Sequence, residues 1–277
     1  MAIPSLALIP SGFKDGKLYS VLPTSGAGDF TVVRGSNATR VNSSGMIETM
    51  TGNEPRLDYT DGGCPVLLTE PQSTNLFEYS EDLSQSSWGT FGPETTRTFN
   101  ATVVNPTGNL GAYVIEGVSG LRRFGTILTV IPNTDYTFSF YVKNVDATLL
   151  KALFTNSSVY SYIYTSQVNT TDWTRVEINF TSSTTTSCIF QITRDLPIGQ
   201  SVYFWGVQLE QETPATSYIS TSGAISTRLA DIVSVDLTSF SLTSITETID
   251  GVDQTPITSI PSTYTIPQGN INKITMI

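Results

Sequence analysis

Three tyrosines, Tyr160, Tyr162 and Tyr164, stand at alternate positions in a short run of the chain. Side chains two residues apart in a β-strand point to the same face, so this spacing predicts three phenol rings on one strand face. Such a strip can stack on sugar rings while its hydroxyl groups hydrogen-bond to polar neighbours. Trp88 is a fourth aromatic candidate for a sugar-binding surface. The alternatives are that the strip packs under a loop or against another subunit, and that Trp88 belongs to the core.

Carboxylates occur in close pairs, Glu78 with Asp82 and Glu210 with Glu212. A glycosidase needs an acid and a base across a cleft, one of them in surroundings apolar enough to keep it protonated. The residues around these pairs do not indicate such a setting. The chain also contains no histidine, which removes the usual general base and the Ser-His and Cys-His nucleophile pairs. We therefore expect no enzymatic activity.

The net charge of −10 excludes two classes of partner. A nucleic-acid backbone and an anionic membrane surface would both be repelled, so we expect neither as a ligand. The two cysteines, Cys64 and Cys188, lie far apart and match no metal-binding spacing. We expect two small buried side chains, with a disulfide as the alternative.

The candidate site residues must be positioned by a fold, and the run from Ser201 to Thr221 indicates the type of fold. Its first half, SVYFWGVQLE, carries bulky apolar side chains on both faces, as a central strand covered from each side does. Trp173 and Trp205 are expected in the core. Residues 136–142 alternate strictly, with apolar side chains on one face and Thr137, Ser139 and Lys143 on the other.

Short strands between turn residues continue along the whole chain, which predicts an all-β protein. Residues 71–228 are expected to form a jelly-roll β-sandwich, and residues 1–70 a set of β-hairpins that serves as an attachment region. Residues 229–277 are expected to form a small C-terminal β region. Asp15-Gly16 and Asp250-Gly251 are the turn dipeptides typical of tight hairpins.

The middle region resembles the jelly-roll carbohydrate-binding modules of the family 4/9 type. The residues that carry the resemblance are Asn75-Leu76, Trp88, the run Pro132 to Lys143, Asp172 to Arg175, Phe180-Thr181 and the run Val202 to Glu210. The resemblance implies the fold and a glycan as a candidate ligand. It also implies a structural calcium ion, for which Glu78, Asp82 and Glu210 are the candidate ligands.

The leading region is similar to tailed-bacteriophage virion proteins of the fibre or appendage kind, including those of crAss-like gut phages. The residues that carry this similarity are Pro10 to Pro23, Gly28 to Val41, Pro55 to Tyr59, Gly63 to Leu68, Glu70-Pro71-Gln72 and Thr74-Asn75-Leu76. It implies a non-enzymatic structural component of the virion, a head fibre or a tail fibre or appendage, that contacts capsid or tail proteins through residues 1–70. The alternative is a glycan-binding adsorption protein that recognises a host surface polysaccharide.

The two flanking regions are rich in short strands and poor in apolar side chains, so each alone would expose unpaired strand edges. The final strand, Ile271 to Ile277, has no obvious ladder partner within residues 229–270. Burial of such edges between symmetric copies would satisfy them, so a homo-oligomer is expected. By the phage resemblance, a trimer is favoured over a dimer.

Overall fold

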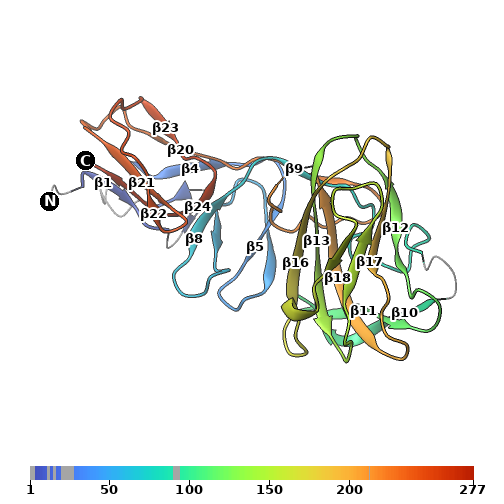
Figure 1. Cartoon of the computed structure of the whole chain (residues 1–277). Coiled ribbons are helices and arrows are strands. Elements are labelled where there is room, and N and C mark those ends of the chain that lie inside the picture. Colours follow the sequence, from blue (N-terminus) through green and yellow to red (C-terminus); the bar gives the residue numbers. More distant parts are fainter. Residues whose placement is uncertain (1–3, 11–12, 15–16, 20–27, 90–93, 212) are drawn as a thin grey trace. The chain divides into compact units, whose positions relative to one another are not determined.

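Almost all regular structure in the described part of the chain is β-strand. The computed structural model describes residues 4–10, 13–14, 17–19, 28–89, 94–211 and 213–277. Within them one short 3-10 helix, η1 (Thr165–Gln167), accompanies the strands, and the predicted all-β fold is confirmed (Figure 1). No helix in these ranges has the length and hydropathy of a membrane span. The chain divides into two compact units, one of residues 73–226 and one of residues 1–72 with 227–277.

The unit of residues 73–226 is a sandwich of two antiparallel sheets. The larger sheet has five strands in the order β10 (Thr95–Val104), β11 (Leu110–Gly117), β18 (Ser201–Glu210), β13 (Asp135–Asn144) and β16 (Thr174–Thr181). The smaller sheet has four, in the order β12 (Phe124–Thr129), β17 (Ser187–Thr193), β14 (Lys151–Phe154) and β15 (Ser161–Ile163). This is the predicted jelly-roll type of β-sandwich, and β18 is its central strand, as the sequence predicted.

Aromatic side chains fill the space between the two sheets. Tyr136, Phe138, Phe140 and Val142 of β13 are at most 1% exposed and face this core, which confirms the predicted alternation. The ring of Phe138 lies between 5.2 and 5.7 Å, centroid to centroid, from four other rings: Phe77, Phe140, Phe154 and Phe190. Burial of each such side chain contributes about 1.5–3 kcal/mol, and a one-residue slip would expose all of them. The core therefore fixes which side chains of β13 face outward.

A β-bulge in β18 explains why this strand is apolar on both faces. The register with β13 shifts near the middle of β18, where Gly206 has a φ of +62°, a conformation that other residues rarely adopt. The extra residue turns both Phe204 and Val207 into the core. Tyr203 and Trp205 lie on the opposite, outer face, where the ring of Tyr218 packs against Trp205.

The second unit combines the two ends of the chain. One sheet has the order β22 (Val252–Asp253), β21 (Ile245–Ile249), β24 (Gly269–Met276), β8 (Val66–Thr69) and β7 (Arg56–Asp58), with β1 (Leu6–Leu8) also paired to β24. Another has the order β2 (Phe13–Lys14), β3 (Lys17–Leu18), β4 (Phe30–Val33), β20 (Ile232–Asp236) and β23 (Thr263–Thr265). A separate pair is formed by β5 (Ala38–Val41) and β6 (Ile47–Met50). The short strands β9 (Ser73–Asn75) and β19 (Ser226–Arg228) lie where the chain passes between the units.

The two predicted tight turns have different outcomes. Asp250 and Gly251 have φ values of +51° and +76°, and they connect β21 and β22 as a hairpin turn of type I′, as predicted. The turn predicted at Asp15 and Gly16 lies outside the described residues, although β2 and β3 on either side of it pair antiparallel.

The flanking regions, which the sequence analysis treated as separate, share one core. Strand β24 pairs with β21 from the C-terminal region and with β1 and β8 from the N-terminal region. Ile271, Ile274 and Met276 are fully buried. The prediction that this strand has no obvious ladder partner within residues 229–270 is therefore wrong, because β21 lies in that range. Its other partners, β8 and β1, lie about 200 and about 270 residues away in the sequence. This strand therefore leaves no unpaired edge from which a homo-oligomer would follow.

A network of buried side-chain ion pairs lies inside this second unit. Asp231 pairs with Arg34 at 2.7 Å and also with Arg56, and Arg56 pairs with Glu70 at 2.7 Å. Arg228 lies 3.5 Å from Glu70 and donates a hydrogen bond to a backbone carbonyl. Burial alone would lower the pKa of the Arg56 guanidinium, but the carboxylates of Glu70 and Asp231 raise it. Three of these five residues belong to the phage-like sequence pattern, so part of that pattern encodes a folding requirement of this unit.

Candidate functional site

The outer face of the five-stranded sheet carries a row of partly exposed side chains. In β18, Tyr203 lies opposite Lys143 of β13 on one side and opposite Val114 of β11 on the other. Trp173 directly precedes β16, next to Thr174, which pairs with Val142 of β13. Trp173, Lys143 and Tyr203 are each half-buried. The row thus presents two aromatic rings and an ammonium group to solvent.

The end of the β10–β11 hairpin reaches this row. The indole N–H of Trp173 donates to the backbone carbonyl of Val104 at 2.7 Å, although β10 and β16 are the opposite edges of the sheet. The register of β10 with β11 shifts between Asn100 and Val104, which bends the hairpin. Asn100 donates from its amide nitrogen to the Tyr203 hydroxyl at 3.3 Å. One edge of the row is therefore bordered by hydrogen-bonding groups of the hairpin.

The next row of the same face is packed and rigid. Tyr141 lies opposite both Trp205 and Arg175, and the Arg175 guanidinium sits 5.7 Å from the centre of the Tyr141 ring. Arg175 also donates to the Ser139 hydroxyl at 3.0 Å. The Trp205 ring is 4.6 Å from that of Tyr218, centroid to centroid. These contacts hold the side chains beside the exposed row in one arrangement. This favours binding, because few side chains lose conformational freedom when a ligand binds.

Further along β18, the outward-facing side chains of Gln208 and Glu210 are buried by other residues of the unit. Gln208 accepts a hydrogen bond from the backbone N–H of Ile219 at 2.6 Å, and Glu210 accepts from Ser73 at 2.7 Å and from Thr216. All of these polar side chains of β18 are buried and satisfied inside the unit. The accessible part of the outer face is therefore the Tyr203 row, which we call the 143–203 face.

The predicted strip of Tyr160, Tyr162 and Tyr164 does not form. The chain leaves β15 before Tyr164, whose side chain is fully buried and donates to the Ile192 carbonyl at 2.7 Å, while burial raises the pKa of its phenol. Tyr162 is half-buried against the core and accepts a hydrogen bond from Gln167 at 2.8 Å. Tyr160 is 64% exposed. The prediction failed because period-2 spacing needs a strand through all three residues, and this strand is too short.

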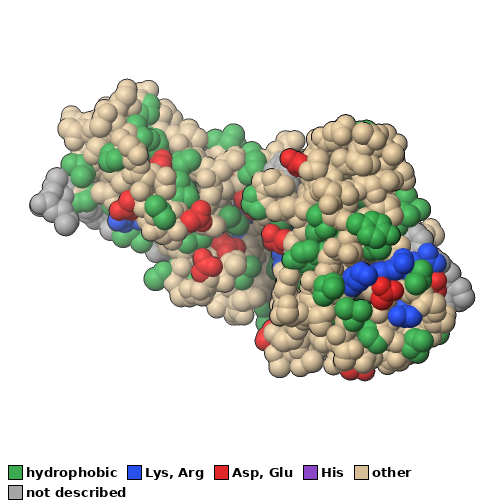
Figure 2. Space-filling view, in the orientation of Figure 1, with side chains coloured by type: hydrophobic (Ala, Val, Ile, Leu, Met, Phe, Trp, Pro, Cys, Tyr) green, Lys and Arg blue, Asp and Glu red, His purple; other side chains and the backbone are tan. Residues whose placement is uncertain are grey.

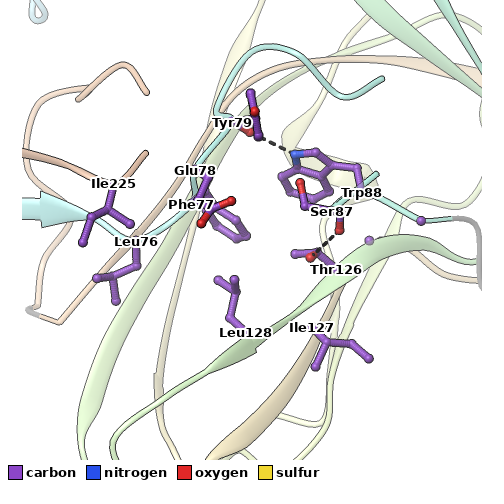
Figure 3. A pocket seen from close by; sticks show the side chains of 12 residues that line it. Leu76, Phe77, Glu78, Tyr79, Ser87, Trp88, Thr126, Ile127, Leu128 and Ile225 are labelled. Carbon is purple, nitrogen blue, oxygen red and sulfur yellow. Dashed lines mark hydrogen bonds between the residues drawn. The ribbon is translucent and has the colours of Figure 1, made fainter. Parts of the chain in front are cut away.

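Trp88 lies in the core and is not a sugar platform. It is 2% exposed, and its ring stacks on those of Phe77 and Phe124 with centroids 5.1 and 5.9 Å apart. Its indole N–H donates to the Tyr79 carbonyl at 2.9 Å (Figure 3). A cavity of about 470 Å³ opens beside it, with Glu78 and Ile225 on its wall. Because Phe77 and Phe124 stack on the Trp88 ring, neither face of that ring is open to a sugar.

The three predicted calcium ligands are not brought together. Asp82 accepts hydrogen bonds from Ser84, Gln85 and Tyr113, which hold the pKa of its carboxyl well below its usual range. Glu210 is buried on the outer face of β18, and Glu78 is exposed at the cavity. Across the described ranges no group of three or more Asp, Glu, His or Cys side chains could hold a metal ion. The neighbour of Glu210 in the sequence pair, Glu212, lies outside those ranges.

The residues of the 143–203 face were not predicted as a site from the sequence. Lys143 was assigned to the outward side of the β13 alternation, which is correct, but no function was attached to it. Trp173 was expected in the core and is instead half-buried on the outer face. The polar side of the β13 alternation could have indicated this face, because Tyr203 of the neighbouring strand β18 lies opposite Lys143.

Comparisons with known proteins point to the same unit. The family model described as carbohydrate binding domain, CBM_4_9, matches residues 76–195, and no curated protein matches the chain. The CBM22-1 xylan-binding domain of Paenibacillus barcinonensis Xyn10C is 13% identical, with a TM-score of 0.37 over 53% of this chain and 98% of that chain. The match to the carbohydrate-binding 4/9 model thus lies within the β-sandwich unit of residues 73–226.

Two further solved structures are larger than the region they share with this chain. The CBM22-1–GH10 modules of Clostridium thermocellum Xyn10B, complexed with xylohexaose, are 14% identical, with a TM-score of 0.36 over 55% of this chain and 30% of that chain. The enzymatically active domain of tailspike protein 4 from Bacteriophage CBA120 is 13% identical, with a TM-score of 0.36 over 49% of this chain and 21% of that chain.

Proposed function

We propose that the unit of residues 73–226 binds a glycan on the 143–203 face. The observation that carries the proposal is the row formed by Trp173, Lys143 and Tyr203, in which partly exposed aromatic rings adjoin hydrogen-bonding side chains on a rigid sheet. The match of residues 76–195 to a carbohydrate-binding family supports it.

The chemistry of the row suits a sugar ring. The C–H groups of a pyranose pack against an aromatic face, and its hydroxyl groups need donors and acceptors at the ring edge. The Tyr203 hydroxyl and the Asn100 amide are held together at 3.3 Å and supply both. The packed row of Tyr141 and Trp205 behind them keeps these groups in place.

We further propose that the protein acts by binding and is not an enzyme. The absence of histidine from the chain supports this, as does the engagement of one carboxylate of each predicted pair, Asp82 and Glu210, in structural hydrogen bonds. Asp82 and Glu210 both accept hydrogen bonds from neighbouring hydroxyl groups. A carboxylate that is held ionised or satisfied in this way is poorly suited to act as a general acid.

We also propose that the protein is a component of a phage virion, as a head fibre or a tail fibre or appendage component. It is supported by the resemblance of residues 10–76 to virion proteins of that kind. In this view the unit of residues 1–72 and 227–277 contacts other virion proteins, and the glycan-binding unit serves adsorption to the host. A homotrimer stays a prediction from the same resemblance. Labelling of the protein on intact particles, followed by imaging, tests the placement.

Glycan binding is tested by affinity electrophoresis of the full chain in gels that contain bacterial surface polysaccharides. We expect Tyr203→Ala to abolish retardation in a gel that retards the wild type, because it removes one ring and one hydroxyl group from the row. Tyr160→Ala is the matched control, since this exposed tyrosine lies outside the 143–203 face, and it should behave as the wild type. Equal retardation of both variants and the wild type would refute the assignment of the face.

A further inference from the structure

Lys143 occupies the middle of the 143–203 face. It lies opposite Tyr203 on β18, and Trp173 stands at the same level next to it at the start of β16. The residue is partly exposed, and its register places it beside Tyr203 on the outer face. Any ligand that stacks on either ring must come close to this charge.

The ammonium group of Lys143 has no hydrogen-bond or ion-pair partner among the described residues. Every other lysine and arginine of this unit has at least one such partner. Arg123 pairs with Glu94 at 2.8 Å and Lys151 with Asp195 at 3.1 Å. The remaining four are bonded to carbonyl, hydroxyl, amide or carboxylate oxygens: Arg97, Arg122, Arg175 and Arg194.

Asp146 and Asp172, which lie close in sequence to Lys143 and Trp173, accept hydrogen bonds within the unit. Asp146, three positions after Lys143, accepts hydrogen bonds from the backbone N–H of Ser201 at 2.7 Å and from its hydroxyl. Asp172, next to Trp173, accepts from the Thr171 hydroxyl at 2.6 Å. A cation without a partner among the described residues, in a unit whose other cations are all bonded, is available to a partner from outside the chain.

From this arrangement we infer that the glycan bound by the 143–203 face is acidic, with a uronate carboxylate or a sulfate group placed on Lys143. The inference rests on the proposed glycan-binding function and names the class of sugar. A charged hydrogen bond to the ammonium group replaces its lost hydration, whereas a neutral sugar leaves the charge unmatched. A sugar that stacks on Tyr203 or Trp173 can direct a ring substituent to the lysine between them.

The overall charge of −10 does not oppose this. At physiological ionic strength, charges are screened over about 8 Å, so most carboxylates of the chain act weakly on a ligand at Lys143. In Figure 2 acidic side chains are scattered over a mostly uncharged surface, and most visible Lys and Arg side chains gather in one cluster toward the right of the view. Local pairing at one lysine therefore decides the preference for an acidic sugar more than the net charge does.

The test compares acidic polysaccharides with their neutralised forms by affinity electrophoresis of the full chain. Polygalacturonate and carboxyl-reduced polygalacturonate form the uronate arm, and carrageenan and desulfated carrageenan form the sulfate arm. We expect the acidic polymer of at least one arm to bind about tenfold more tightly than its neutralised form, as a charged hydrogen bond would give. The arm in which this occurs identifies the acidic group.

Variants then assign the preference to Lys143. Lys143→Met keeps the length of the side chain without its charge, and it should reduce acidic-polymer affinity about tenfold, to that of the neutralised polymer. Lys143→Arg should retain most of the preference. Lys151→Met is the control, because Lys151 is paired with Asp195 on the other sheet and should not affect binding.

The outcomes separate the two proposals. Equal binding of acidic and neutralised polymers by the wild type, with loss of both in Tyr203→Ala, would leave glycan binding standing and overturn the role of Lys143. An acidic preference that survives in Lys143→Met would overturn it as well. If neither form of either polymer, nor any surface polysaccharide, is bound, both proposals fall.

Discussion

Arg56 and Asp231 are separated by 175 positions in the sequence, yet their side chains form an ion pair in which neither is more than 2% exposed. Asp231 also pairs with Arg34 and accepts a hydrogen bond from the backbone N–H of Glu70 at 2.9 Å. One carboxylate thus holds segments from both ends of the chain. This pair explains why the N-terminal and C-terminal regions form a single unit.

Replacement of Asp231 is expected to destabilise that unit strongly. Asp231→Asn leaves Arg34 and Arg56 buried with less compensating charge, and breaking a buried pair in this way costs about 3–5 kcal/mol. Urea unfolding followed by circular dichroism measures the loss. The control is Asp61→Asn, since Asp61 lies exposed in a turn, and its stability should stay within about 0.5 kcal/mol of the wild type. Similar midpoints for both variants would contradict the role of the network.

Deletion of residues 268–277 is expected to unfold the unit of residues 1–72 and 227–277. The deletion removes β24, which pairs with β1, β8 and β21, and takes three fully buried side chains from the core. Limited proteolysis should cut the truncated protein within that unit and leave residues 73–226 intact. Light scattering on the full-length protein reports the oligomeric state separately. A truncated protein that resists protease throughout would show that β24 is dispensable.

Truncation of Trp205 should cost about 3–5 kcal/mol, the usual range for a buried aromatic residue. The ring is 2% exposed and lies between those of Tyr141 and Tyr218, with centroids 5.7 and 4.6 Å away. Thermal unfolding of Trp205→Ala measures the loss. In a variant that retains Trp205 as its one tryptophan, the fluorescence maximum should be blue-shifted. A maximum like that of free tryptophan in water would place the ring in solvent.

The two cysteines should differ sharply in reactivity. Both are free thiols; Cys64 is exposed, whereas Cys188 is buried and its pKa is raised to about 12 by that burial. The thiolate is the reactive form, so a thiol reagent at pH 8 should modify Cys64 and spare Cys188 until the protein is unfolded. Mass spectrometry of the native and urea-treated protein counts the modified sites. Cys64→Ser should abolish the native reaction altogether.

Acid should weaken the contact between Glu94 and Arg123. Hydrogen bonds from Arg123 lower the pKa of Glu94 from 4.5 to about 2 in the folded protein. A carboxyl group whose pKa is lowered by folding stabilises the protein above its unfolded-state pKa, and this contribution is lost as the pH falls from about 4.5 to about 2. Glu94→Gln should therefore have a lower melting temperature than the wild type at pH 6. The difference should vanish near pH 2, and a constant difference would contradict the assignment.

Local patterns in the sequence predicted local structure well. The alternation from Tyr136 to Val142 gave the inward face of β13, and the apolar run from Val202 to Leu209 identified the central strand. Both depend on side chains a few positions apart. The pairing of β24 with β1 could not be predicted in this way, because nothing near either strand specifies a partner at the other end of the chain.

The candidate site was harder to predict for a related reason. Tyr160, Tyr162 and Tyr164 have the spacing of a strand face, but the strand ends before the third of them. Tyr203 and Lys143 are 60 positions apart and become neighbours only through the register of β13 with β18, which is itself shifted by the bulge at Gly206. A surface built across strands is visible only once the register is known.

The hydrogen bond from Arg228 to the carbonyl of Pro71, 2.7 Å long, has a consequence for the evolution of the gene. It fastens the positions at which the chain leaves the ion-paired unit and returns to it, with 156 residues between them. A recombination event could exchange this intervening segment for another domain whose two termini lie close together. Such an exchange would leave intact every ion pair within the unit of residues 1–72 and 227–277. The unit of residues 73–226 could then be replaced while the ion-paired unit stays the same.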